Sequence, residues 1–303
     1  MTEFELRIIQ WMRDIATPFT DAVFEVITSL AEQLVLVFAL ILIYFFYSKK
    51  VGQNFVFTFF VGSLLNNSIK GLVSRVRPFN HELADFEPAR AETATGYSFP
   101  SGHSQNAALS YTLLSRLINK KWAKWSAGII IGAVGISRLF LGVHYPTDVI
   151  AGIALGVGCA LVGSYLHKKY EHDFQKQMVL YGLVALFFLP FVFIFWKGTY
   201  EQTLPYKDFY TAYAFYLGYV IAVYFEHRFV DFDCSQPVKI RLIRCALAIV
   251  IVIGCYLGLK LVFPDNSIFF DMLRYFLLSV ITLGIYPIAA KKWLFFKKPN
   301  DAE

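Results

Sequence analysis

The sequence predicts an all-α protein whose helices cross a membrane several times. Of its 303 residues, 57% are hydrophobic and only 17% are charged. The apolar residues gather in repeated runs of roughly 20 residues, the length at which an α-helix spans a bilayer. Because a chain in hydrocarbon must satisfy its own backbone hydrogen bonds, we expect these runs to be helices packed into a polytopic bundle.

The first 29 residues have a different pattern, in which Leu6 and Trp11 alternate with charged residues such as Glu5 and Arg13. The segment lacks the basic start, apolar middle and small-residue cleavage site of a signal peptide. The alternation predicts an amphipathic helix on the membrane surface. A leader helix that packs on the bundle explains the same pattern, and the sequence does not separate the two.

Nine membrane-length helices are expected after this segment. Their ranges are 30–48, 52–73, 103–118, 125–143, 147–166, 178–197, 208–226, 244–262 and 269–290. Most loops between them are short, whereas the acidic loop 74–102 is long enough to form a solvated cap, part of which could line a site. We therefore divide the chain into an N-terminal segment (1–29), a polar-motif core (30–170) and a C-terminal part (171–303).

Three cations, Lys70, Arg77 and Arg138, lie in or beside these apolar runs. A cation among hydrocarbon costs several kcal/mol unless it is offset, so such residues are presumed functional. The two arginines offer planar forks that grip phosphoryl oxygens in pairs, and the lysine adds a point charge. An anion, and best a phosphoryl group, is the predicted partner.

The stretch Pro100-Ser101-Gly102-His103 stands directly before a long apolar run. Ser101 is therefore expected to cap a helix whose first amides, unobstructed at Gly102, point at a bound oxyanion. His103 is a titratable group at the same place, and it can protonate a leaving oxygen and later activate water.

A second histidine, His144, precedes a helix that Pro146 is suited to start. This spacing puts Asp148 in the first helical turn, from which its carboxylate can reach one imidazole nitrogen. The other nitrogen would then be a nucleophile, in a division of roles like that of a Ser-His-Asp triad.

These residues form three motifs, Lys70-x6-Arg77-Pro78, Pro100-Ser101-Gly102-His103 and Ser137-Arg138-x5-His144-x3-Asp148. They resemble the signature motifs of the type 2 phosphatidic acid phosphatase superfamily, which includes lipid phosphate phosphatases, glucose-6-phosphatase and vanadium haloperoxidases. The resemblance covers the chain to about residue 165. It implies a core of six spans, so that about three C-terminal spans are additional.

The resemblance also implies the roles of individual residues. His144 would become a phosphohistidine, Asp148 would orient it, and His103 would act as acid and then as base. Phosphate would be bound without a metal or another cofactor by the remaining motif residues, Lys70, Arg77, Ser101, Gly102 and Arg138.

The expected function is hydrolysis of a lipid phosphomonoester or diphosphate. Undecaprenyl diphosphate, phosphatidic acid and phosphatidylglycerophosphate all supply a tail and an anionic phosphate, and the sequence does not choose among them. Two alternatives stay open: a phosphotransferase that passes the phosphate to a second lipid, and a non-enzymatic transporter or scaffold. Vanadate-dependent oxidation is disfavoured because the chain is embedded in a membrane.

The distribution of basic residues predicts the orientation. Of the 28 Lys and Arg residues, 17 fall in loops on the face opposite the motifs. The positive-inside rule then places the N-terminus outside, the C-terminus in the cytoplasm and the site on the extracytoplasmic face. The overall resemblance implies a bacterial plasma membrane.

Several further expectations concern partners and packing. The net charge of +6 reflects these basic loops, which can also contact lipid head groups, and not a nucleic-acid site. The four cysteines show neither disulfide nor metal spacing. Tyr206, Tyr210, Tyr213 and Tyr216 share one helix face that is expected to pack the bundle. A homodimer and a monomer are both compatible with the sequence.

Overall fold

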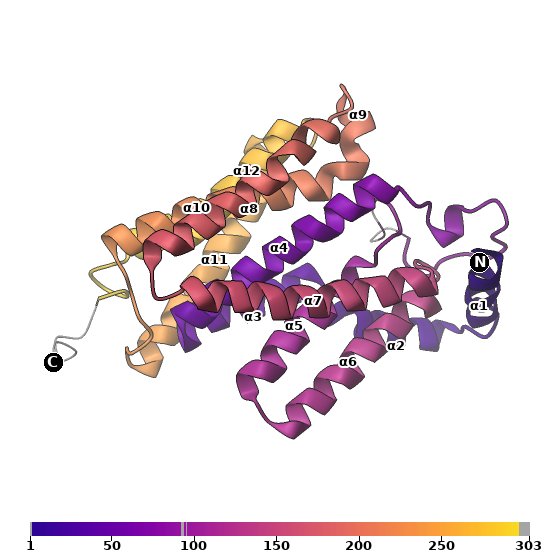
Figure 1. Cartoon of the computed structure of the whole chain (residues 1–303), viewed down its shortest axis with the longest axis horizontal. Helices are drawn as coiled ribbons and strands as arrows, with labels where there is room; N and C mark the ends of the chain where they lie inside the picture. Colours follow the sequence, from indigo (N-terminus) through magenta and orange to yellow (C-terminus); the bar gives the residue numbers. More distant parts are fainter. Residues whose placement is uncertain (1, 92–93, 95, 297–303) are drawn as a thin grey trace. The chain divides into compact units, whose positions relative to one another are not determined.

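The computed structural model describes residues 2–91, 94 and 96–296, and every regular element within these residues is a helix (Figure 1). The predicted all-α class is therefore confirmed. Residues 297–303, which contain the predicted cytoplasmic C-terminus, lie outside the described residues.

Seven helical segments are long and apolar enough to cross a membrane. They are Pro18–Tyr47, Lys49–Asn80, Lys121–Phe140, Pro146–Tyr170, Phe174–Ile194, Val238–Val262 and Ile268–Ala289. Each overlaps one of the nine predicted ranges. The other two ranges are also helical: α5 (Gly102–Ile118) has 17 residues, and α10 (Lys207–Phe229) has 23 residues but is less apolar.

The chain forms two compact units. The first consists of Met1–Leu36 and Val61–Tyr165, and the second of Val37–Phe60 and Leu166–Glu303. Helices α4 (Lys49–Val73) and α7 (Pro146–Tyr170) contribute residues to both units. The division at residue 170 that the sequence suggested thus stays a prediction.

The N-terminal segment is two helices and not one amphipathic helix. α1 (Thr2–Asp14) ends before Thr17, whose side-chain oxygen accepts a hydrogen bond of 3.2 Å from the backbone N–H of Thr20. Together with proline at the first position, this cap starts the second helix, α2 (Pro18–Ser29). α2 then continues into the first candidate span.

The first helix packs on the rest of the first unit. Leu6 and Ile9 of α1 are buried in one cluster with Tyr145, which lies in the loop before α7. Among the two expectations for this segment, the structure favours the leader helix that packs on the bundle. Although α1 lies far from His144 in the sequence, it packs against Tyr145, the residue that follows His144.

The remaining helices of the first unit surround the predicted motifs. Besides α2, α5 and parts of α4 and α7, they are α3 (Gln33–Leu42, in part), the 3₁₀ turn η2 (Pro78–Asn80) and α6 (Lys121–Phe140). α5 and α6 are joined by a short turn in which Asn119 adopts a left-handed conformation, with a φ of 50°. Asparagine tolerates this region well, so the turn ends α5 without strain.

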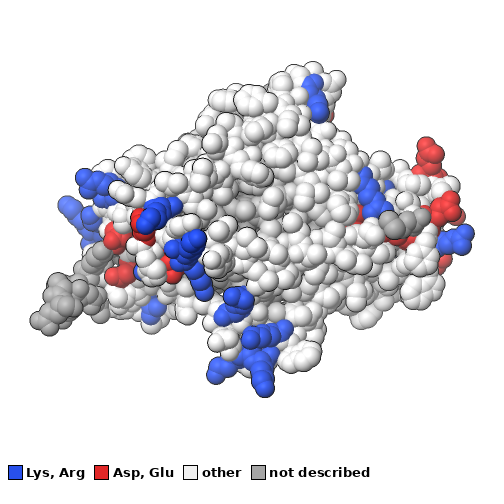
Figure 2. All heavy atoms as spheres, viewed as in Figure 1, with Lys and Arg blue, Asp and Glu red and all other residues white. Residues whose placement is uncertain are grey.

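This α5–α6 turn has the side chains expected at a membrane surface. Figure 2 shows Lys and Arg atoms grouped over it, where Lys120, Lys121 and Lys124 are exposed. Trp122 and Trp125 at the start of α6 are 62% and 77% exposed. Tryptophan and lysine at a helix end are typical of the interface between hydrocarbon and water.

The second unit is built from the C-terminal helices, the parts of α3 and α4 that fall within Val37–Phe60, and the end of α7 from Leu166. Its other elements are the π-helical turn η1 (Ile43–Tyr47), α8 (Phe174–Ile194), α9 (Tyr200–Thr203), η3 (Leu204–Tyr206), α10, α11 (Val238–Val262), α12 (Ile268–Val280), η4 (Ile281–Ile285) and α13 (Tyr286–Ala289).

The tyrosine face of α10 packs inside the second unit. Three of its hydroxyls donate hydrogen bonds of 2.7 to 3.0 Å to backbone carbonyl oxygens of α8. The bonds join Tyr210 to Val192, Tyr213 to Ala185 and Tyr216 to Tyr181. The expectation that these tyrosines pack the bundle is confirmed for these three, because a buried hydroxyl needs such a partner. Tyr206 lies in η3, before α10 begins.

In the first unit, α7 approaches α5 more closely than side chains would allow. A Cβ atom at Gly152 would lie 2.5 Å from the carbonyl oxygen of Ser101, and one at Gly156 would lie 2.4 Å from that of Gln105. The backbone N–H of Ser101 also donates a 2.9 Å hydrogen bond to the carbonyl oxygen of Asp148. These glycines therefore hold the second and third motifs against each other.

We expect Gly152→Ala to lower the free energy of unfolding by about 1–3 kcal/mol, because the added methyl group overlaps the α5 backbone. Thermal unfolding of the detergent-solubilised protein measures the change. Gly158→Ala is the matched control on the same helix, since a Cβ atom there would have no neighbour within 4 Å. The control should keep or raise the Tm. Equal Tm values for the two variants would contradict the close contact.

Candidate active site

All eight residues predicted for the site belong to the first unit. Lys70 lies in the last turn of α4, and Arg77 directly precedes η2. Ser101 caps α5, and Gly102 and His103 begin it. Arg138 lies in the last turn of α6, His144 in the loop before α7, and Asp148 in the first turn of α7. Polar groups are thus supplied by helix ends, where the backbone leaves free donors and acceptors.

His144 and Asp148 form the pair that their spacing predicts. The imidazole Nδ1 lies 3.4 Å from Asp148 Oδ2, and both side chains are buried. The same carboxylate oxygen accepts a 3.0 Å hydrogen bond from the backbone N–H of Tyr145 and one from the hydroxyl of Ser98. Asp148 is therefore held firmly by several donors while it faces His144.

Arg77 lies at the other edge of the imidazole, with Nη1 3.3 Å from His144 Nε2. A guanidinium group only donates hydrogen bonds, so Nε2 is the acceptor in this contact. The proton of the neutral ring is then on Nδ1, which faces Asp148. The structure thereby favours the tautomer with a lone pair on Nε2.

Burial lowers the pKa of His144 well below its ordinary value, and the nearby charges of Arg77, Lys70 and Arg138 lower it further. Since the neutral form of histidine prevails above its pKa, the ring is uncharged at neutral pH. An uncharged imidazole with an unprotonated Nε2 can act as a nucleophile toward an electron-poor centre.

The cations around His144 are anchored mainly by neutral oxygens. Arg77 donates to the carbonyl oxygens of Gly96 and Val143, each at 3.0 Å, and Lys70 Nζ donates to that of Tyr97 at 2.8 Å. Part of the loop 74–102 therefore shapes the site, as the sequence left open.

Arg138 is 1% exposed and donates a 2.8 Å hydrogen bond from Nη1 to the hydroxyl of Thr28. Its Nε is buried and has no hydrogen-bond partner. An unpaired buried donor on a cation is costly, and a phosphoryl oxygen would satisfy it.

The start of α5 leaves room for a ligand. A Cβ atom at Gly102 would find its nearest neighbour, Asn66 Oδ1, at 3.9 Å, so packing does not require glycine there. Ser101 Oγ accepts a hydrogen bond from Ser104 Oγ at 2.9 Å, which holds the hydroxyl within the helix cap. The first amides of a helix carry partial positive charge, and they attract an anion to this open place.

His103 is the second residue of α5, at the helix end that Ser101 caps. Burial lowers the pKa of His103 well below its ordinary value, and the charges of Arg138, Arg90, Lys70 and Arg77 lower it further. The predicted acid thus lies at the same end of α5 as the predicted phosphate-binding residues Ser101 and Gly102.

Asn66 also lies at the site, although its residue type did not predict it. Its side chain is buried, its Nδ2 has no hydrogen-bond partner, and it lies beside Gly102. Asn66 stands four residues before Lys70, so the two share one face of α4. That helical spacing is the signal in the sequence that could have found it.

A second group of missed residues supports Asp148 from behind. Arg75 Nη1 donates to Asp148 Oδ1 and to Thr147 Oγ1, each at 2.7 Å. Arg75 Nη2 donates at 2.7 Å to Glu5 Oε2, and Glu5 Oε1 accepts from the N–H and the hydroxyl of Thr147 at 3.0 and 2.6 Å. Glu5 is 3% exposed, although its place in the sequence suggested a solvated helix face.

The described side chains can therefore perform two tasks. Lys70, Arg77 and Arg138 can neutralise an anion with several oxygens, and the neutral Nε2 of His144 can attack its central atom. Such a combination of positioning and charge stabilisation is what phosphoryl transfer requires.

Comparisons with known proteins agree with this chemistry. A family model described as the PAP2 superfamily matches residues 51–171, and one described as a PAP2 superfamily phosphatase, transmembrane extension, matches residues 210–297. All eight predicted site residues lie within the first of these segments.

Three relatives illustrate the similarity. Phosphatidylglycerophosphatase B of Bacillus subtilis is 37% identical over 44% of this chain and 64% of its own length. Undecaprenyl-diphosphatase of Sulfolobus acidocaldarius is 40% identical over 38% of this chain and 55% of its own length. The crystal structure of a transmembrane PAP2 type phosphatidylglycerolphosphate phosphatase from Bacillus subtilis is 30% identical, with a TM-score of 0.45 over 55% of this chain and 86% of that one. The chain thus spans less than two thirds of the first two relatives.

Proposed function

The chain belongs to the PAP2 superfamily, and on this premise we propose that it is an integral membrane phosphatase that hydrolyses a lipid phosphomonoester or diphosphate. The observation that carries the proposal is the placement of His144 between Asp148 at Nδ1 and Arg77 at Nε2. This placement leaves an unprotonated nitrogen beside a phosphate-binding cation. A pure binding protein has no need of such an oriented imidazole.

The reaction proceeds in two steps. In the first, His144 Nε2 attacks phosphorus, the N–P bond forms, and the P–O bond to the leaving group breaks while His103 gives that oxygen a proton. In the second, His103 takes a proton from water, whose oxygen attacks phosphorus and releases phosphate as the N–P bond breaks. Asp148 stabilises the positive charge that the imidazole carries between the steps.

Phosphate is held without a metal ion in this proposal. The forks of Arg77 and Arg138 and the ammonium group of Lys70 pair with its oxygens, and the amides that follow Ser101 at Gly102 add to the cradle. The unpaired Nε of Arg138 supports this assignment, because it is a buried donor that a ligand oxygen can fill.

The substrate is proposed to be an amphiphile. The cations lie at the ends of membrane-length helices, so a phosphate head group can reach them while its tail stays in the bilayer. The named relatives act on phosphatidylglycerophosphate and undecaprenyl diphosphate according to their names. Both molecules fit the same class of anionic lipid phosphate.

In a phosphate-release assay with phosphatidylglycerophosphate, phosphatidic acid and undecaprenyl diphosphate, we expect His144→Ala to lower turnover by about 10³-fold or more, since no nucleophile remains. His172→Ala, whose side chain is 76% exposed, is the matched control and should keep normal turnover. The parent protein should form an acid-labile, base-stable phosphoenzyme, and a chelator should leave its activity intact.

Normal turnover of His144→Ala would show that the proposed nucleophile is wrong. Loss of activity with a chelator, restored by one divalent ion, would contradict the metal-free cradle. Phosphate transfer to an added lipid in place of release would favour the phosphotransferase.

The site is proposed to face the extracytoplasmic side, as the distribution of basic residues suggests. Cysteines at Glu82, in the loop 74–102, and at Lys120, in the α5–α6 turn, test this, because both positions are exposed. A membrane-impermeant maleimide added to intact cells should label Glu82→Cys and spare Lys120→Cys. The reverse pattern would place the site in the cytoplasm.

A further inference from the structure

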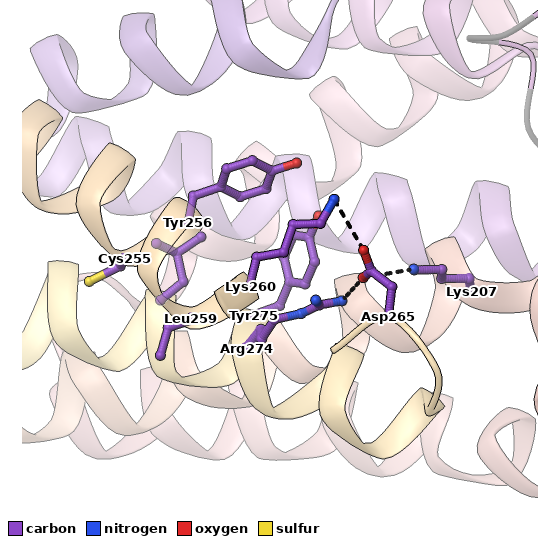
Figure 3. Close-up of a pocket in the computed structure, with 9 residues that line it drawn as sticks. Lys207, Cys255, Tyr256, Leu259, Lys260, Asp265, Arg274 and Tyr275 are labelled. Carbon is purple, nitrogen blue, oxygen red and sulfur yellow. Dashed lines mark hydrogen bonds and ion pairs between the residues drawn. The ribbon is translucent and has the colours of Figure 1, made fainter. Parts of the chain in front are cut away.

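A cavity of about 230 Å³ lies in the second unit, between the start of α10, the end of α11 and α12 (Figure 3). The loop 263–267 beside it joins two candidate membrane spans, so the cavity lies where helices leave the membrane. None of the eight predicted site residues lines it. A cavity of this volume has room for a small polar head group.

Three cations lining this cavity converge on one carboxylate, as Figure 3 shows. Lys260 Nζ lies 3.1 Å and Lys207 Nζ 3.7 Å from the oxygens of Asp265, and Arg274 donates to the same group. Behind them, the buried Asp271 pairs with Arg274 and, at 3.1 Å, with Lys207. The exposed carboxylate thus sits where several donors meet.

Asp265 and Lys260 are the most exposed members of this cluster, with side chains 39% and 58% exposed, whereas the side chain of Lys207 is 28% exposed. Although burial acts to raise it, hydrogen bonds from Arg274 and Lys260 lower the pKa of Asp265 to about 2. The surroundings of this carboxylate therefore favour a negative charge strongly.

The other walls of the cavity are apolar and aromatic, and they include Leu259, Leu278 and Tyr275. The outer surface of α11 next to them is also apolar, since Leu261 is 88% exposed and Val262 68% exposed. A ligand with an anionic head and a hydrocarbon tail matches both features. Its head would meet the cations and its tail would lie along α11.

We propose that this cavity binds the phosphate head group of an anionic phospholipid, in competition with the carboxylate of Asp265. The site is distinct from that of the proposed hydrolysis, and a phosphodiester lipid such as phosphatidylglycerol suits it. If the lipid phosphate and the Asp265 carboxylate compete for the same cations, Lys260 favours lipid binding and Asp265 opposes it.

Titration of the full-length detergent-solubilised protein with short-chain phosphatidylglycerol tests the claim. We expect Lys260→Gln to weaken binding about threefold to tenfold, since one charge-assisted contact is lost, and Asp265→Asn to strengthen it by a similar factor. Lys239→Gln, an exposed lysine at the other end of α11, is the matched control and should leave the affinity unchanged.

Unchanged affinity in both cluster variants would overturn the proposal, as would equal binding of short-chain phosphatidylcholine. Competition by inorganic phosphate at the same concentration as the lipid would show a site for free phosphate and would overturn the lipid assignment. A Tm equal to that of the parent shows that each variant is folded.

A second observation, the ion pair of Glu5 with Arg75, carries an independent inference. Arg75 shares the Asp148 carboxylate with His144, and Glu5 fixes both Arg75 and the backbone N–H of Thr147. Glu5 lies outside both segments that the family models match. Burial acts to raise the pKa of Glu5, yet hydrogen bonds from Thr147 and Arg75 lower it overall, so the group is ionised at neutral pH.

We infer that Glu5 is a positioning residue, which acts through Arg75 and Thr147 to orient Asp148 toward His144. This inference rests on the proposed hydrolysis. The charges then alternate along the contacts from Glu5 to Arg75 to Asp148, and the Asp148 carboxylate faces the neutral imidazole of His144. Without the Glu5 charge, Arg75 loses one of its two carboxylate partners and pairs more strongly with Asp148, which draws Asp148 away from the imidazole.

We expect Glu5→Gln to lower kcat about tenfold and to leave KM unchanged, because Glu5 touches none of the phosphate-binding residues. Formation of the phosphoenzyme should slow by the same factor. Glu5→Asp, which keeps the carboxylate, should recover part of the lost kcat. Glu3→Gln, exposed on the same helix, is the matched control.

A kcat for Glu5→Gln equal to that of Glu3→Gln would overturn the inference. A lower kcat together with a changed KM and a lower Tm would also overturn it, because the variant would then be poorly folded. If the parent protein is active and His144→Ala is not, either result leaves the proposed hydrolysis standing. Inactivity of the parent protein would instead count against the hydrolysis itself.

Discussion

The candidate site depends on one buried carboxylate. Asp148 accepts hydrogen bonds from the Tyr145 backbone, Ser98 and Arg75, and it faces His144, while its own carbonyl oxygen accepts the N–H of Ser101. A buried carboxylate is tolerated only with several hydrogen-bond donors, so the position of each donor is fixed by its bond to Asp148. The three motifs are thereby drawn to one point, and the imidazole tautomer is set as a consequence.

Close backbone packing supplies the rigid frame for this carboxylate. The glycines of α7 let its first turns lie against the start of α5, so that Asp148 and Ser101 are joined through backbone atoms and not through mobile side chains. A site built on such contacts keeps its geometry within the small tolerance that phosphoryl transfer requires. In the second unit, tyrosine hydroxyls bound to carbonyl oxygens of α8 join helices in a different way.

Much of the fold and of the site could be predicted from local pattern. Apolar length located helices at all nine ranges, and residue type with spacing predicted the cations, both histidines and Asp148 as residues of the site. The prediction for residues 1–29 was less accurate because the cap at Thr17 and Pro18 divides the segment, and periodicity does not detect such a break. Asn66 was missed although its spacing from Lys70 was visible, since an amide carries no charge to draw attention to it.

The sequence by itself determined the helical class and the places of the helices, because these follow from hydrophobic length, and side-chain chemistry predicted which residues bind phosphate. Only the tertiary structure decided that Glu5 and Arg75 support Asp148 and that Asp265 meets three cations. The packing of the helices determines which residues meet in these contacts. Glu5 and Thr147, more than a hundred positions apart in the sequence, show why no local pattern contains that information.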